Sequence, residues 1–169
     1  AFDRVPIFGA YLNSVILSGS VTVIVMALAG LAAFALVRFQ FKGRKMLMSV
    51  VVASMMFPAF STIVPVFRME ASWGIVNSSN RWISLIACAL PQIAGNLSFA
   101  IIVLSGYIRS LPVELEEAAF LEGCGAFQIF RKIVVPLSKP SFATVAIFTF
   151  LWSYNDLFNQ SFFLRIQKQ

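Results

Sequence analysis

The chain has 169 residues, of which 59% are hydrophobic and only 12% are charged. Ordinary soluble domains carry about 25% charged residues, and a small water-soluble fold leaves much of its surface exposed. This composition excludes a soluble globule, a disordered chain and a disulfide scaffold, and it indicates a protein of the lipid bilayer. The net charge of +6 comes from short basic clusters between apolar runs, which is typical of membrane topology signals rather than of nucleic-acid binding.

Several kinds of catalytic and cofactor site are excluded by the residues present. The sequence has no histidine, so the commonest general base and metal ligand is missing. Its two cysteines, Cys88 and Cys124, lie far apart in sequence and form neither a CxxC motif nor a metal site. The string Gly43-Arg44-Lys45 lacks the glycine-rich lead-in of a nucleotide-binding loop. We therefore expect no catalytic residue, no metal and no cofactor bound by this chain, and no nucleic-acid partner.

Four apolar segments are long enough to cross a bilayer as helices, which takes roughly 20 residues. They cover residues 12–37, 46–67, 83–108 and 140–164. The first is rich in small residues, which let helices pack closely in lipid. Pro58 and Pro65 in the second each remove a backbone hydrogen bond, so we expect a bent or broken helix there. The sequence thus predicts an all-α fold, a polytopic transmembrane helical bundle of about four spans, forming a single domain over residues 1–169.

Polar side chains interrupt two of these segments. Gln92 and Asn96 lie in the middle of the third, and Asn155 and Asp156 lie near the end of the fourth. Polar groups at that depth face a protein neighbour or a water-filled cavity. Two roles stay open for them: they line a solute pathway, where amides bind hydroxyl groups, or they form hydrogen bonds between helices.

The charge of the loops predicts the topology. If the loops at 38–45 and 109–139 share one side of the membrane, that side holds eight of the thirteen basic residues. These eight are Arg38, Lys42, Arg44, Lys45, Arg109, Arg131, Lys132 and Lys139. The positive-inside rule then places both loops in the cytoplasm.

The most charged stretch of the chain predicts two short helices inside the loop 109–139. The first starts after Ser110 as the N-cap, has Pro112 in its first turn and ends at Gly123 as the C-cap. At about ten residues, or roughly 15 Å, it is too short to span a membrane. The second begins near Ala126 and ends before Pro136.

The first short helix has a distinctive face. Glu114, Glu117 and Leu121 share one side of it, at positions i, i+3 and i+7, while Ala118 and Ala119 keep the surface low. An acidic, partly apolar helix of this kind fits a groove on a separate protein. The alternative is an amphipathic connector that lies on the membrane interface.

A family resemblance rests on this stretch. The pattern Glu117-Ala118-Ala119, Gly123, Ile133 and Val135-Pro136 resembles the EAA signature of ABC importer permeases, with Val135 in place of leucine. Further segments are similar to the carbohydrate-uptake branch of that family, the maltose-type second permease. They are Asn13-Ser14, Phe57-Pro58, the stretch 73–78, the stretch 136–140 and the stretch 152–156.

The resemblance implies a transport subunit rather than an enzyme. It implies a multi-pass permease of the bacterial cytoplasmic (inner) membrane that forms the pathway for a small solute, a sugar or oligosaccharide. Its partners would be an ATP-binding subunit dimer that holds ATP and Mg, a second permease, an extracytoplasmic solute-binding protein and membrane lipid. The EAA loop would be the coupling helix, with Glu117 against a basic residue of the ATPase and Gly123 at the change of direction. The family has six spans, so we expect this fragment to lack the first and the last.

Two other classes of function stay open as alternatives. A channel or secondary transporter would need internal repeats or an ion-binding set, and the sequence shows neither. An intramembrane enzyme could use Asp156, because a carboxylate inside a span is functional by default. A proteolytic dyad needs a second carboxylate, however, and the outer positions Asp3 and Glu70 are poor partners.

Overall fold

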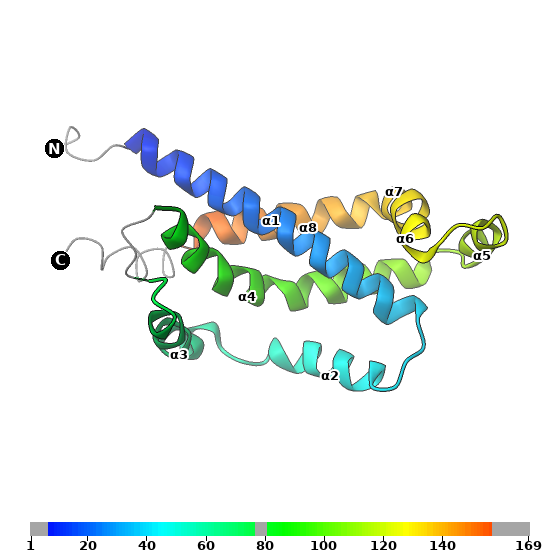
Figure 1. The fold of residues 1–169 in the computed structure, drawn as a ribbon, viewed down its shortest axis with the longest axis horizontal. Coiled ribbons are helices and arrows are strands. Elements are labelled where there is room, and N and C mark those ends of the chain that lie inside the picture. Colours follow the sequence, from blue (N-terminus) through cyan, green and yellow to red (C-terminus); the bar gives the residue numbers. More distant parts are fainter. Residues whose placement is uncertain (1–6, 77–80, 157–169) are drawn as a thin grey trace. The chain divides into compact units, whose positions relative to one another are not determined.

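The computed structural model describes residues 7–76 and 81–156, and all secondary structure assigned within these ranges is helical (Figure 1). The all-α prediction is therefore confirmed. The elements in chain order are α1 (Ile7–Arg38), α2 (Arg44–Ser54), α3 (Ala59–Ser72), α4 (Arg81–Ser110), α5 (Glu114–Leu121), α6 (Ala126–Ile129), the π-helical turn η2 (Phe130–Val134), α7 (Val135–Leu137) and α8 (Lys139–Asn155).

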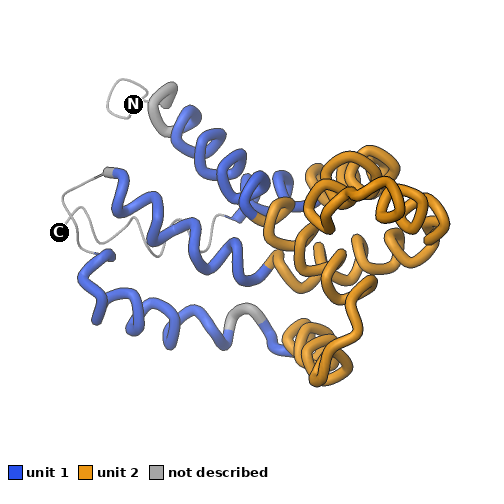
Figure 2. Tube along the Cα trace, turned by 45° about the vertical axis from the view of Figure 1, so that its right-hand side comes forward, with its two compact units in different colours: residues 1–24, 57–95, 148–169 blue, residues 25–56, 96–147 orange. Residues whose placement is uncertain are grey.

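The helices divide between two compact units (Figure 2). Within the described ranges, unit 1 takes residues 7–24, 57–76, 81–95 and 148–156. Unit 2 takes residues 25–56 and 96–147. The basic loop after α1 and the whole of the 109–139 loop belong to unit 2.

Two helices are long and apolar enough to cross a membrane, namely Tyr11–Arg38 of α1 and Trp82–Ser110 of α4. They have 28 and 29 residues, with mean hydropathies of 2.5 and 1.8. They correspond to the first and third predicted spans. Two hydroxyl groups inside α1 bond to the helix backbone, since Thr22 Oγ1 donates to the Ser18 carbonyl and Ser20 Oγ donates to the Ile16 carbonyl, both at 2.7 Å. Such a bond removes the cost of placing a hydroxyl in an apolar surrounding.

The second predicted span is two helices rather than one. α2 ends at Ser54, and α3 begins after Pro58, whose φ of −66° and ψ of 125° are extended rather than helical. Proline has no N–H to donate, and it also restrains Phe57 away from the helical region. The predicted break is confirmed, but neither piece is long enough to count as a span by itself. Pro65, in contrast, lies inside α3 without ending it.

The fourth predicted span begins one residue early, at Lys139, and α8 runs to Asn155. Its remaining residues, 157–164, lie outside the described part of the chain. The stretch Ala126–Leu137 and α8 form a bent pair with an angle of 79° between them. Within the described residues there are thus two spans, or three if this bent pair counts as one, against the four that the sequence predicts.

Small residues of α1 form the packed centre of unit 2, as the sequence predicts. Ala29 and Ala33 are fully buried, together with Leu104 and Ile108 of α4. Gly30 lies against α8 so closely that a Cβ there would stand 2.8 Å from Phe142 Cζ. The glycine therefore permits a close approach of the aromatic ring.

Candidate functional site

The candidate coupling helix, α5, starts later than the sequence predicts. Its N-cap is Val113, so Pro112 lies before the helix rather than in its first turn. Ser110 belongs to the end of α4, where its hydroxyl donates to the Tyr107 carbonyl at 2.7 Å. The predicted N-cap is therefore wrong, because α4 continues further than its apolar residues do. Glu114, Glu116 and Glu117 occupy the first turn of α5, where the helix dipole favours negative charge.

The C-terminal end of α5 forms a Schellman motif. Glu122 is the C-cap, and Gly123 follows it with a φ of +85°. The Cys124 N–H donates to the Ala119 carbonyl and the Gly123 N–H to the Phe120 carbonyl, both at 3.0 Å. The left-handed conformation at position 123 favours glycine, which has no Cβ to clash. The predicted helix end at Gly123 is confirmed to within one residue.

The two faces of α5 differ in exposure. Glu116 and Ala119 are buried, at 9% and 8% exposure. The opposite face is exposed, and Leu121 there reaches 87%. The sequence assigns six residues to the predicted coupling set, and five of them are exposed. They are Glu114, Glu117, Ala118, Leu121 and Gly123. Ala119 is the one member of that set that faces the protein, so its small side chain serves the packing of α5.

Arg38 at the end of α1 holds the buried face of α5. Its Nε donates to Glu116 Oε1 at 2.8 Å, and its Nη2 lies 2.8 Å from the same oxygen. Nη2 also donates to the carbonyls of Ile108 and Leu111, at 2.9 and 3.1 Å. One guanidinium thus joins the ends of α1 and α4 to α5, and it donates to two carbonyl groups at the C-terminal end of α4. Figure 1 shows α5 beyond the C-terminal end of α4.

The second half of the loop packs on the same two helices. Ile129, Phe130 and Val134 are buried, and the Phe130 ring lies 5.3 Å from that of Phe34 on α1. The Tyr107 hydroxyl of α4 donates to the Leu137 carbonyl at 3.3 Å. The loop is therefore fixed at both ends to α1 and α4.

The prediction that this second helix ends before Pro136 is wrong. The helical stretch passes through the π-helical turn and continues to Leu137. Proline is tolerated because it stands in the first turn of α7, where its missing N–H matters little.

The polar residues of the predicted spans have different surroundings. Gln92 of α4 is 3% exposed, and its Oε1 accepts a hydrogen bond from the Ser153 hydroxyl of α8. Asn96 is 8% exposed and belongs to unit 2, whereas Gln92 belongs to unit 1. Asn155 is exposed and donates to the Leu151 carbonyl at 2.8 Å, and Asp156 is half-buried.

Sequence reasoning missed Arg38 and Glu116 as partners. Arg38 was assigned only to topology, and Glu116 was not among the residues singled out for coupling. A signal was available, since Glu116 lies on the side of the helix opposite to the Glu114 and Leu121 face. Across residues 7–76 and 81–156, no group of three His, Cys, Asp or Glu side chains could hold a metal ion.

A family model and two curated proteins match this chain. The family model described as "Binding-protein-dependent transport system inner membrane component" matches residues 25–167. The trehalose transport system permease protein of Mycobacterium tuberculosis is 37% identical over 148 residues, which cover 88% of this chain and 52% of that protein. The melibiose/raffinose/stachyose import permease protein of Bacillus subtilis is 32% identical over 169 residues, covering 99% and 59%. The chain spans about half the length of the curated relatives it matches.

A solved structure has a similar fold. The crystal structure of a bacterial ABC transporter involved in the import of the acidic polysaccharide alginate aligns with a TM-score of 0.60. The alignment covers 85% of this chain and 50% of that chain, at 24% sequence identity. This likeness shows that the two chains share a fold over the aligned part.

Proposed function

Because the chain belongs to the family of binding-protein-dependent transport system inner membrane components, we propose that it is the membrane-spanning permease of an ABC importer. It is a multi-pass protein of the inner membrane, and its named relatives are transport components rather than enzymes. The proposed role is to form the translocation pathway for a small solute. The named relatives transport trehalose or melibiose, raffinose and stachyose, which supports a sugar or oligosaccharide as that solute.

The proposed partners follow from the same membership. An ATPase dimer holds ATP and Mg, a second permease completes the pathway, and an extracytoplasmic solute-binding protein delivers the solute. In this proposal α5 is the coupling helix that docks in a groove of the ATPase. Glu114, Glu117 and Leu121 are the docking face, and the loops at 38–45 and 109–139 lie in the cytoplasm, as their basic residues indicate.

The observation that carries the coupling proposal is that one face of α5 is bound to the rest of unit 2 while the opposite face is exposed. The buried face is held by Arg38, which also binds the end of α4, so α5 moves together with two long helices. The exposed face presents carboxylates and an apolar side chain, Leu121, that is 87% exposed. A coupling helix needs one face bound to the membrane-spanning helices and the other face accessible to the ATPase.

The mechanism proposed here needs no nucleotide on this chain. Closure of the ATPase dimer moves the docked α5 as a rigid body, and the attached helices rock between inward-open and outward-open arrangements. ATP biases this equilibrium because it binds the closed dimer better than the open one. Because Arg38 transmits the motion as hydrogen bonds and an ion pair, its removal should uncouple ATP hydrolysis from transport rather than stop hydrolysis.

The test is a charge reversal on the exposed face. Glu117→Lys in the assembled transporter should lower solute uptake in reconstituted vesicles by roughly tenfold or more, because it reverses a charge-assisted contact. Membrane insertion of the chain should stay unchanged. Glu122→Lys is the matched comparison, since it makes the same reversal at the C-cap, after the last helical residue of α5.

A second readout separates docking from damage to the fold. A cysteine at Leu121 should form a disulfide with a cysteine in the ATPase groove, and ATP should change the yield. Normal uptake by Glu117→Lys, together with no disulfide between Leu121→Cys and the ATPase, would refute the docking role and favour the interfacial connector.

A further inference from the structure

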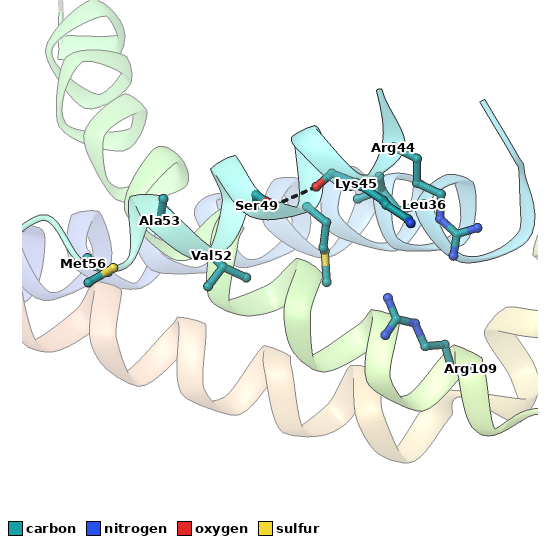
Figure 3. A pocket seen from close by; sticks show the side chains of 9 residues that line it. Leu36, Arg44, Lys45, Ser49, Val52, Ala53, Met56 and Arg109 are labelled. Carbon is teal, nitrogen blue, oxygen red and sulfur yellow. Dashed lines mark hydrogen bonds between the residues drawn. The ribbon is translucent and has the colours of Figure 1, made fainter. Parts of the chain in front are cut away.

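A cavity of about 860 Å³ lies in unit 2, away from α5. Pockets for small ligands measure about 300–1,000 Å³. Figure 3 shows its walls. It is lined by Leu36, Arg44, Lys45, Met48, Ser49, Val52, Ala53, Met56 and Arg109.

The lining of this cavity divides into a cationic end and an apolar end. Arg44 and Lys45 at the start of α2 and Arg109 at the end of α4 gather at one end (Figure 3). Val52, on the following turns of α2, and Met56, just beyond its C-terminus, lie toward the other end (Figure 3). The lining is complementary to a ligand with a negatively charged headgroup and a hydrocarbon chain.

The three cations have no negative partner in the described part of the chain. The ion pair found within residues 7–76 and 81–156 is Arg38 with Glu116, and no acidic residue lines the cavity. Like charges that converge repel one another, and the repulsion is relieved when an anion binds between them. Arginine in particular binds phosphate oxygens through paired N–H groups. The hydroxyl of Ser49 is already committed, since it donates to the Lys45 carbonyl at 3.0 Å.

α2 leaves its apolar side chains uncovered. The helix has no buried residue, and Met46 and Val50 are 72% and 54% exposed. At the cavity itself, Val52 is 48% and Met56 is 82% exposed. α2 is nevertheless positioned against α4, because Ser54 Oγ and Ser98 Oγ lie 2.6 Å apart. Exposed apolar area of this extent marks a surface that contacts lipid or protein.

We propose that this cavity binds one anionic phospholipid of the inner leaflet. The phosphate lies among Arg44, Lys45 and Arg109, and an acyl chain runs along Val52 and Met56. A free phosphate would use only the cationic end, and a neutral lipid only the apolar end. Basic pockets beside transmembrane helices on the cytoplasmic side bind anionic headgroups for this reason. The proposal rests on the membrane location and the positive-inside topology, not on the solute or the ATPase.

The experiment uses the assembled transporter, with the full-length chain, in nanodiscs of phosphatidylglycerol and phosphatidylcholine. Photoactivatable phosphatidylglycerol should label α2, and photoactivatable phosphatidylcholine should label it less. The variant Arg44→Gln/Lys45→Gln/Arg109→Gln should lose roughly tenfold or more of the phosphatidylglycerol labelling, because each cation near a membrane surface contributes to anionic lipid binding. Lys42→Gln is the control, since Lys42 belongs to the same basic loop but does not line the cavity.

A second variant keeps the three charges and fills the apolar end. Val52→Trp should also reduce phosphatidylglycerol labelling, and normal solute uptake will show that each variant is folded. Equal labelling by the two lipids, or full labelling of the triple variant, would overturn the proposal. It would also be overturned if a photocrosslinker at Ser49 captured another protein segment and no lipid.

Discussion

Arg38 and Glu116 lie 78 positions apart in the sequence and are joined by an ion pair of 2.8 Å. The side chains are only 14% and 11% exposed, so water screens the pair weakly. The same guanidinium binds two carbonyls at the end of α4. The contribution of the two partners is therefore unequal, since the arginine binds three residues and the Glu116 carboxylate binds one.

Removal of the arginine should destabilise the protein more than removal of the carboxylate. Arg38→Ala leaves Glu116 and the two carbonyls without their donor, which costs about 1.5–3 kcal/mol for a hydrogen-bonded charged group. Glu116→Gln keeps the carbonyl contacts and offers a neutral acceptor, so its cost should be smaller. The measurement is the thermal midpoint of the purified transporter, together with the solute imported per ATP hydrolysed. Equal losses from the two variants would contradict this account.

The left-handed backbone at Gly123 predicts which substitutions that position accepts. Gly123→Ala places a Cβ in a conformation that costs an L-residue about 1–2 kcal/mol. Gly123→Asn should cost less, because asparagine tolerates this region better than other residues. Protease sensitivity of the loop, measured against Gly125→Ala as a control with ordinary φ, will check the order. A loop as resistant with alanine as with glycine would show that the Schellman motif does not stabilise it.

The close approach at Gly30 predicts overpacking. Gly30→Ala puts a methyl group 2.8 Å from Phe142 Cζ, and such overpacking costs about 1–3 kcal/mol. Gly19→Ala on the same helix meets nothing within 4 Å and should be neutral. Phe142→Leu combined with Gly30→Ala should recover part of the loss, because the leucine is shorter than the ring. The comparison needs only thermal midpoints of the four proteins.

Glu70, at the end of α3, predicts a pH dependence of stability. It is 1% exposed and outside the two long spans, and burial raises its pKa from 4.5 to about 7. Below about pH 4.5 the carboxyl is protonated in both the folded and the unfolded chain, and its contribution to stability is fully present. As pH rises from about 4.5 to about 7, the unfolded chain has released a proton that the folded chain still retains, so stability falls, and it levels off once the folded chain is ionised as well.

Glu70→Gln should therefore flatten the thermal midpoint between pH 5 and pH 8 and raise it at pH 8. Glu114→Gln, a change at an exposed carboxylate, should leave the profile as it is. An unchanged slope in Glu70→Gln would mean that another group titrates in this range.

The hydrogen bond from Ser153 to Gln92 predicts a structural role for this amide rather than contact with solute. Gln92→Ala should lower the thermal midpoint and leave the order of preferred solutes unchanged. Asn96→Ala tests the other buried amide of α4 in the same uptake assay. A changed solute preference in either variant would instead favour a place on the translocation pathway.

Local chemistry in the sequence predicted the features that depend on neighbouring residues. Pro58 separates α2 from α3 because its ring acts on the residues beside it, and Gly123 ends α5 because only the local backbone matters there. The prediction of Ser110 as an N-cap was wrong, because α4 extends beyond its apolar residues. Ser110 is the last residue of α4, and its hydroxyl donates to the Tyr107 carbonyl within that helix.

Features that depend on tertiary contacts could not be predicted from residue patterns. The sequence indicates only a topology signal for Arg38, because its ion pair with Glu116 depends on the position of α5. The sequence predicts coupling for Ala119, but only the structure shows that its side chain is buried. The second predicted span is not a single helix, because Pro58 divides the hydrophobic run. The continuation of the helix through Pro136 depends on the π-helical turn before it, which no pattern of apolar residues reveals.

That π-helical turn, Phe130–Val134, accommodates a residue that a regular helix would not need. Deleting one residue there would let the turn close as α-helix and swing everything before it by about 100°, the angle between successive residues. Ile129, which is buried on the turn before it, would then rotate away from its packing contacts. The chain should consequently accept most substitutions among the exposed residues of this turn but tolerate no change in its length.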